Sequence, residues 1–102
     1  MTDEREAPTR PPAPLELRPF IDDEGRLKQW PVKFSKQMVA LEWLSQLFER
    51  SRDYTEPEVN DLLNTAHTFE DWAILRRGLC DHRWLERDPN GAWYRRTAKD
   101  AG

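Results

Sequence analysis

Cys80 and His82 are the residues of this chain whose side chains most readily act as nucleophile, base or metal ligand, and they lie two positions apart. Residues two apart on a helix do not face each other, and no second cysteine completes a Cys-x-x-Cys pair. A zinc site therefore lacks its ligands. The chain also shows no nucleophile-elbow spacing and no glycine-rich phosphate loop. We expect no enzymatic activity, no metal and no cofactor.

The acidic stretch Asp22-Asp23-Glu24-Gly25 is the other candidate for ion binding. An EF-hand loop needs oxygen ligands at alternate positions and a glutamate at its twelfth position. Here the acids are consecutive, and the twelfth residue counted from Asp22 is Lys33. The stretch therefore predicts a solvated turn.

Arginines gather near the end of the chain, where Leu75 to Arg96 includes six of them, although the formal net charge is -3. A second basic stretch, residues 25–41, has four bases and no acid. Such segregation allows a local basic face on an acidic protein. The candidate nucleic-acid contacts are Lys28, Lys33, Lys36, Arg77, Arg87, Arg95 and Arg96.

The neighbours Arg76 and Arg77 are predicted to have different roles. Counted from Trp72 at about 100° per residue, Arg76 falls at about 40°, inside the apolar arc of its helix, and Arg77 at about 140°, outside it. We predict that the stem of Arg76 packs in the core while its guanidinium reaches a carboxylate or a carbonyl. Arg77 is predicted to be exposed and open to a ligand.

Composition divides the chain into three parts. Residues 1–19 are rich in proline and poor in large apolar side chains, which predicts a disordered leader. Residues 20–96 form the expected domain, and residues 97–102 a flexible tail. The leader lacks the features of a secretory signal, no apolar run is long enough to span a bilayer, and the single cysteine suits a reducing compartment. These features predict a cytoplasmic protein without a membrane partner.

The first predicted helix covers residues 35–50 and is capped by Ser35. Most of its apolar residues share one broad face, but Trp43 falls on the opposite side. Such a helix is either central to the domain, which we favour, or partly covered by a partner. Trp43 is therefore expected at a subunit contact, or beneath the leader or the Phe20-Ile21 segment.

The second helix has a complete start signal. Thr55 and Glu58 form a capping box, in which each side chain satisfies the backbone N–H of the other, and Tyr54 and Val59 occupy the hydrophobic-staple positions. The helix is expected to end near Ala66. The preceding residues 52–54 could form an edge strand.

A third helix, residues 69–83 with Thr68 as a possible cap, precedes strands at 85–87 and 92–96, and Asp88-Pro89-Asn90-Gly91 suits the turn between them. Trp93 then points away from the face shared by Leu85 and Tyr94. The order is helix, short strand, helix, helix and two-stranded wing. This predicts a mainly α fold with a small β-hairpin, the winged helix-turn-helix.

Three segments, FIDDEGRLKQWPVKFSKQMVALEWL, YTEPEVNDLL and LRRGLCDHRWLERDPNGAWYRR, resemble an uncharacterised bacterial domain family over about residues 17–96. Its members occur alone or as the C-terminal part of helix-turn-helix transcription regulators. Where the family often has a glycine after the Asp81 region, this chain has His82-Arg83-Trp84. The resemblance implies a winged-helix-like fold and an association with transcription, and it implies no ligand.

Two functions compete at this point. A winged helix could bind duplex DNA through its third helix and wing, although Glu70, Asp71 and Asp81 place acids on the reading helix. Alternatively, the same fold could be a protein-interaction module that docks on transcription machinery or pairs with itself, with Trp43 and Trp93 at the interface. Neither function implies a small-molecule ligand.

Overall fold

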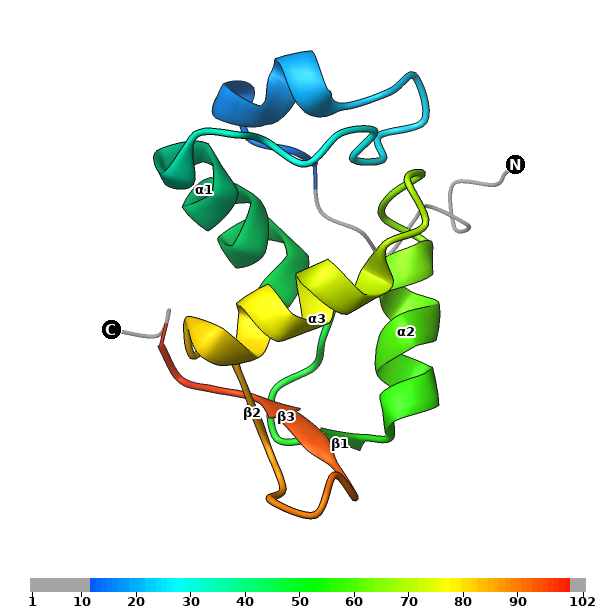
Figure 1. Ribbon diagram of the computed structural model, residues 1–102, viewed down its shortest axis with the longest axis vertical. Coiled ribbons are helices and arrows are strands. Elements are labelled where there is room, and N and C mark those ends of the chain that lie inside the picture. Colours follow the sequence, from blue (N-terminus) through cyan, green and yellow to red (C-terminus); the bar gives the residue numbers. More distant parts are fainter. Residues whose placement is uncertain (1–11, 100–102) are drawn as a thin grey trace, which may run out of the picture.

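The computed structural model describes residues 12–99. Within this range the chain forms four helices and a three-stranded antiparallel sheet (Figure 1). The elements, in order, are the 3₁₀ helix η2 (Leu15–Phe20), α1 (Phe34–Ser45), β1 (Asp53–Tyr54), α2 (Glu56–Asn64), α3 (Trp72–Asp81), β2 (Leu85–Arg87) and β3 (Tyr94–Arg96). The sheet and η2 lie at opposite ends of the molecule, with the α-helices between them (Figure 1).

Helix α1 is central because it is covered on both sides. Ala40, Leu41 and Leu44 are buried on the side of the main core, and Trp43, which faces the other way, is only 3% exposed. The segment that contains η2 provides the second cover, and Trp43 shares a small cavity with Pro12 and Pro14. Trp43 is therefore buried by the chain itself. Of the two predicted environments, the structure has the cover by the N-terminal segment, and Trp43 has no exposed surface left for a partner.

The predicted boundary at residue 20 is placed too late. Leu17 of η2 is fully buried in the core, so at least part of the predicted leader belongs to the folded domain. Residues 1–11 lie outside the described part. The predicted tail also begins too early, because Thr97 continues the ladder by donating its N–H to Trp84 at 3.0 Å. A single buried leucine in a proline-rich context gives too weak a periodic signal to be recognised in sequence.

Helix α1 begins and ends differently from the prediction. Lys33, in an extended conformation, is the N-cap and makes no side-chain capping bond, so Ser35 is not the cap. The Gln37 side chain instead holds the incoming chain by donating to the Pro31 carbonyl at 2.7 Å. The helix stops at Ser45, before the predicted end at residue 50, and the following turn brings Phe48 into the core against the edge of the Tyr54 ring.

Helix α2 has the predicted capping box. The Thr55 hydroxyl accepts from the Glu58 N–H at 3.3 Å, and the Glu58 carboxylate accepts from the Thr55 N–H at 2.8 Å. Tyr54 and Val59, the two staple positions, are both buried. This local arrangement fixes the direction in which α2 leaves strand β1.

Helix α3 starts three residues later than predicted, and Asp71 rather than Thr68 caps it by accepting from the Ile74 N–H at 3.2 Å. The buried His67 lies just before this start and bonds to both neighbouring elements. Its Nδ1 donates to the Leu63 carbonyl at 2.7 Å, while its Nε2 accepts from the Asp71 N–H at 3.0 Å. The imidazole therefore joins the end of α2 to the start of α3. Residues 68–70 form the turn between them, with Glu70 at a positive φ of 58°.

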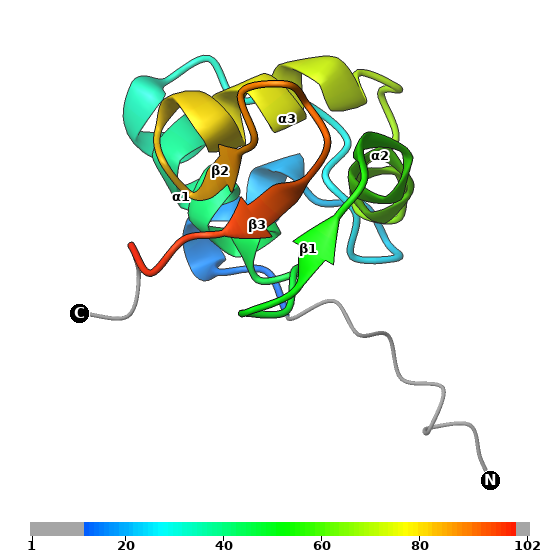
Figure 2. The ribbon, with the colours of Figure 1, turned by 90° about the horizontal axis from the view of Figure 1, so that it is seen from below.

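The sheet has the order β1-β3-β2, so the predicted short strand lies at one edge (Figure 2). Tyr94 pairs with both Tyr54 and Arg87, and Gly91 closes the hairpin turn by donating to the Asp88 carbonyl at 2.8 Å. Gly91 adopts a φ of 78°, which favours glycine there. Helix α3 packs closely on α1, since a Cβ at Gly78 would lie 3.1 Å from a methyl of Leu41.

Candidate binding surfaces around helix α3

Arg76 and Arg77 leave α3 in different directions. The Nη1 of Arg76 donates to the Asn60 amide oxygen at 2.7 Å and lies 3.3 Å from the Glu56 carboxylate, and its side chain is 20% exposed. Its guanidinium also lies over the Trp72 ring, at 5.4 Å. Arg76 thus ties α3 to the start of α2. Arg77 is exposed.

Two of the candidate nucleic-acid contacts are engaged within the chain. Arg95 lies on the outer face of the sheet, 2.6 Å from Asp53 and 3.8 Å from Glu86, and its guanidinium covers the half-buried Trp93 at 4.3 Å. The hydrogen bond from Arg95 holds the pKa of Asp53 below its usual value. Arg96 donates to the Phe48 carbonyl at 3.1 Å. The positive charges of Arg95 and Arg96 are therefore largely matched by acceptors within the fold.

Beside α3 the charge balance is different. A cavity of about 400 Å³, which we call the arginine pocket, lies between α3 and the hairpin. Arg77 from α3 and Arg87 from β2 line it, and neither side chain has a hydrogen-bond or ion-pair partner among residues 12–99. The remaining lining residues are Ala73, Arg76, Cys80, Asp81 and Tyr94.

The pKa of the Cys80 thiol depends on both burial and nearby charges at this pocket. Burial raises its pKa, the positive charges of Arg87 and Arg76 oppose this, and Asp81 adds a small further rise. The thiol is therefore protonated near neutral pH. A nucleophilic role needs the thiolate, so this environment does not favour one.

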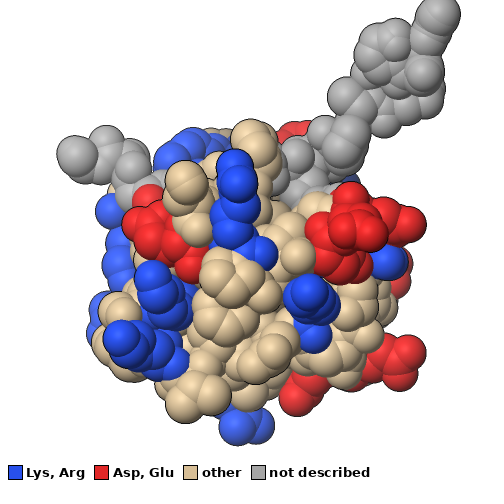
Figure 3. Space-filling view, turned by 90° about the horizontal axis from the view of Figure 1, so that it is seen from above, with Lys and Arg blue, Asp and Glu red and all other residues tan. Residues whose placement is uncertain are grey.

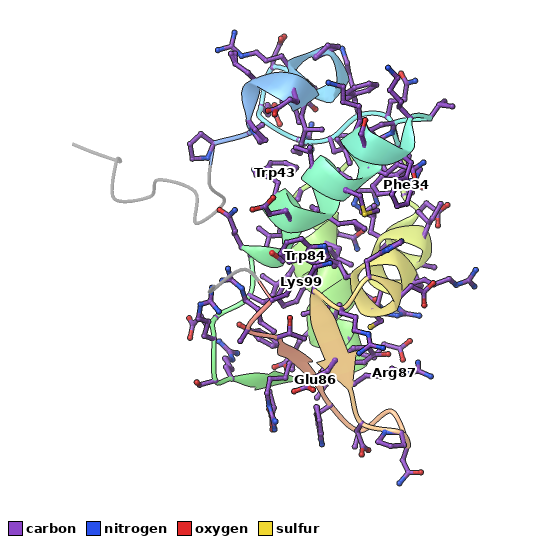
Figure 4. All side chains as sticks on the ribbon, turned by 90° about the vertical axis from the view of Figure 1, so that its left-hand side faces the viewer. Phe34, Trp43, Trp84, Glu86, Arg87 and Lys99 are labelled. Carbon is purple, nitrogen blue, oxygen red and sulfur yellow. The ribbon has the colours of Figure 1, made fainter. Side chains whose placement is uncertain are left out.

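A larger cavity of about 860 Å³, the end groove, lies on the other side of Arg87. Cys80 and Arg83 at the end of α3 form one part of it, all of β2 another, and Thr97, Ala98 and Lys99 the rest. The Lys99 ammonium donates to the His82 carbonyl at 2.6 Å and covers the Trp84 ring at 4.5 Å. Lys99, Glu86 and Arg87 are seen along this side of the molecule in Figure 4.

The start of α1 carries an apolar surface near the end groove. Phe34 is 61% exposed, Val32 is 89% exposed, and the Phe34 ring packs edge-on against His82, whose carbonyl binds Lys99. Lys33 and Lys36 flank Phe34 in the sequence, so this apolar surface is bordered by positive charge. Phe34 was not predicted to be a surface residue, because an aromatic residue at the start of a helix usually signals burial.

The candidate bases do not form one continuous face. Lys28 lies in the segment paired with η2, where its N–H donates to the Phe20 carbonyl, away from the hairpin. On the face around η2, Lys and Arg side chains alternate with clusters of acids (Figure 3). Acids also occupy the helix starts, with Glu56 and Glu58 at α2 and Glu70 and Asp71 at α3. These are the positions where a DNA-binding helix usually meets phosphates.

Comparison with known proteins identifies the family and no function. The model of a family described as "uncharacterized protein conserved in bacteria (DUF2087)" matches residues 26–96. This chain belongs to that family. The searches of curated proteins and of solved structures gave no match. The DUF2087 region contains every residue of the arginine pocket, whereas η2 and residues 97–99 lie outside it.

Residues 12–99 contain neither a membrane-spanning helix nor a cluster of metal ligands. No helix in this range is long and apolar enough to cross a membrane. No group of three or more His, Cys, Asp or Glu side chains there is placed to hold a metal ion. In the acidic turn, the Asp22 carboxylate instead accepts from the N–H groups of Glu24 and Arg26, both at 2.9 Å.

Proposed function

We propose that this DUF2087 domain is a non-enzymatic, cytoplasmic protein-interaction module with a winged-helix arrangement. The order α1, β1, α2, α3, β2, β3 and the placement of β1 beside the hairpin support the arrangement. The partner segment would combine acidic and apolar side chains. The observation that carries the proposal is the end groove with its excess of basic side chains, together with the exposed Phe34, whose ring packs against His82 beside Lys99.

The charges of the end groove specify the partner. Arg83, Arg87 and Lys99 line it against one acid, Glu86. Opposite charges steer a partner to such a surface and select against basic partners. The exposed Phe34 ring supplies the aromatic anchor that protein interfaces favour. A partner with an apolar side chain next to aspartate or glutamate would satisfy both features.

Photocrosslinking in bacteria tests this proposal. A benzophenone amino acid at Phe34 should yield a discrete adduct with one protein, and the same replacement at the equally exposed Leu15 on η2 should not. Lys99→Glu should weaken the adduct because it reverses one charge of the groove, whereas Arg18→Glu, on η2, should leave it unchanged. Equal adducts at positions 34 and 15, or none at either, would contradict the proposal. An adduct between two copies of this chain would assign the surface to self-association.

Duplex DNA binding is the second candidate, and the unpaired Arg77 and Arg87 beside α3 support it. With Arg95 and Arg96 engaged inside the fold, five candidate bases remain: Lys28, Lys33, Lys36, Arg77 and Arg87. Because each phosphate contact contributes about -0.9 to the slope of log affinity against log salt, the slope should not be steeper than about -4.5. The interaction-module proposal instead expects no retention of random or genomic duplexes at about 50 mM salt.

A further inference from the structure

We propose that the arginine pocket binds the terminal phosphate of a small phosphate monoester. The pocket shares Arg87 and Cys80 with the end groove, but the proposal does not need the partner proposed for that groove. It rests on Arg77 and Arg87, which line one cavity from two different elements and have no acidic partner among residues 12–99. Arginine side chains are the usual receptors for phosphate oxygens, because the guanidinium can donate two parallel hydrogen bonds.

The charged residues that line the pocket leave it with a net positive charge. Arg76 also lines the pocket, but its Nη1 is engaged by Asn60 and Glu56. It is therefore not counted among the groups that would bind the phosphate. Asp81 is the one acid in the lining, and no ion pair joins it to Arg77 or Arg87. Two unpaired guanidinium groups and one carboxylate leave an excess of positive charge that an anion would neutralise.

A monoester fits this site better than the backbone of a nucleic acid. A phosphate monoester carries close to two negative charges at neutral pH, which matches the two unpaired arginines. Its terminal group presents three oxygens into a concave site from one side. A backbone phosphodiester carries one negative charge, and the nucleic-acid chain continues from it on both sides, so the pocket would need two openings.

Titration with phenyl phosphate, followed by NMR of the backbone amides and the arginine Nε–H groups, tests the proposal. We expect saturable shifts at Arg77, Arg87 and the amides of residues 73–81, with a dissociation constant of about 1 mM. Arg77→Gln and Arg87→Gln should each raise that constant at least tenfold. Arg18→Gln, which removes the same charge from an exposed position of η2, should not change it.

Further measurements separate the possible phosphate sources. Affinity should fall as the pH drops below about 6, where the monoester dianion takes up one proton and becomes a monoanion. Benzoate should bind more weakly than phenyl phosphate. Equal weakening by all three variants would show a general charge effect and overturn the proposal, as would the absence of saturable shifts. A short duplex DNA that shifts the same groups at lower phosphate concentration would overturn the monoester assignment in favour of the nucleic-acid backbone. Circular dichroism of the variants confirms that they are folded.

Discussion

The outer face of the sheet and the corner between α3 and β2 are both rich in arginine, yet their electrostatics differ. On the sheet, Arg95 lies between Asp53 and Glu86 and covers Trp93, so its charge is used within the fold. At the corner, Arg77 and Arg87 have no such partners among the described residues. The number of arginines in a segment therefore does not define a binding face. A binding face is defined by the arginines that the fold leaves without an acidic ion-pair partner.

The largest expected effect is a difference in the free energy of unfolding between variants of the two adjacent arginines of α3. Arg76→Ala should lower the free energy of unfolding by about 1.5–3 kcal/mol, because it removes charge-assisted hydrogen bonds and leaves Asn60 and Glu56 without their partner. Arg77→Ala should change it by less than about 0.5 kcal/mol, as for other surface positions. Urea denaturation measures both. Similar losses for the two variants would mean that Arg77 is also structural and would break the comparison.

A smaller effect is expected on the reactivity of Cys80 at the corner. Since burial raises the thiol pKa, iodoacetamide should label Cys80 more slowly than a free thiol at pH 7.5, and labelling should accelerate as pH rises. Arg87→Gln should slow labelling further, because it removes a positive charge that favours the thiolate. Arg95→Gln, on the outer face of the sheet, is the matched control and should leave the rate unchanged. Faster labelling of the Arg87→Gln protein would show that steric cover, not charge, dominates at this pocket.

The smallest expected effect is an acid-dependent loss of stability on the sheet. The pKa of Asp53 is lower in the folded chain than in the unfolded one. Its pairing with Arg95 therefore stabilises the fold fully above the unfolded value, near 4. This stabilisation is lost as pH falls through the folded value. Thermal melts between pH 6 and pH 3 should show a shallower decline for Asp53→Asn than for the parent chain. Asp23→Asn, an exposed acid of the turn after η2, should decline as the parent does.

Local chemistry determined the features that the sequence predicted well. The Thr55–Glu58 capping box and the turn at residues 88–91 depend on residues close in the chain, and both have the expected geometry. The same holds for the two directions of Arg76 and Arg77, which follow from helical spacing. The sequence also suggested an edge strand at residues 52–54, and the structure has it at Asp53–Tyr54.

The features that sequence reasoning missed depend on contacts between distant residues. The partners of Arg95 come from β1 and β2, so its engagement could not be read from its own segment. Before the late start of α3, the two nitrogens of the buried His67 bond to Leu63 at the end of α2 and to Asp71 at the start of α3. The exposure of Phe34 depends on what η2 and the end of α3 leave uncovered. The arginine pocket likewise arises from the approach of α3 and β2.

The burial of Leu17 has a consequence for where this domain can be cut. The family match begins at residue 26, but the side chain that completes the core comes from η2, nine residues earlier. A fragment trimmed to residues 26–96 would lose that side chain, uncover Trp43 and give up the Thr97 bond to Trp84. The packed and hydrogen-bonded structure therefore extends beyond the region of family similarity at both ends, from η2 to Thr97. Fragments used for expression should therefore include η2 and Thr97.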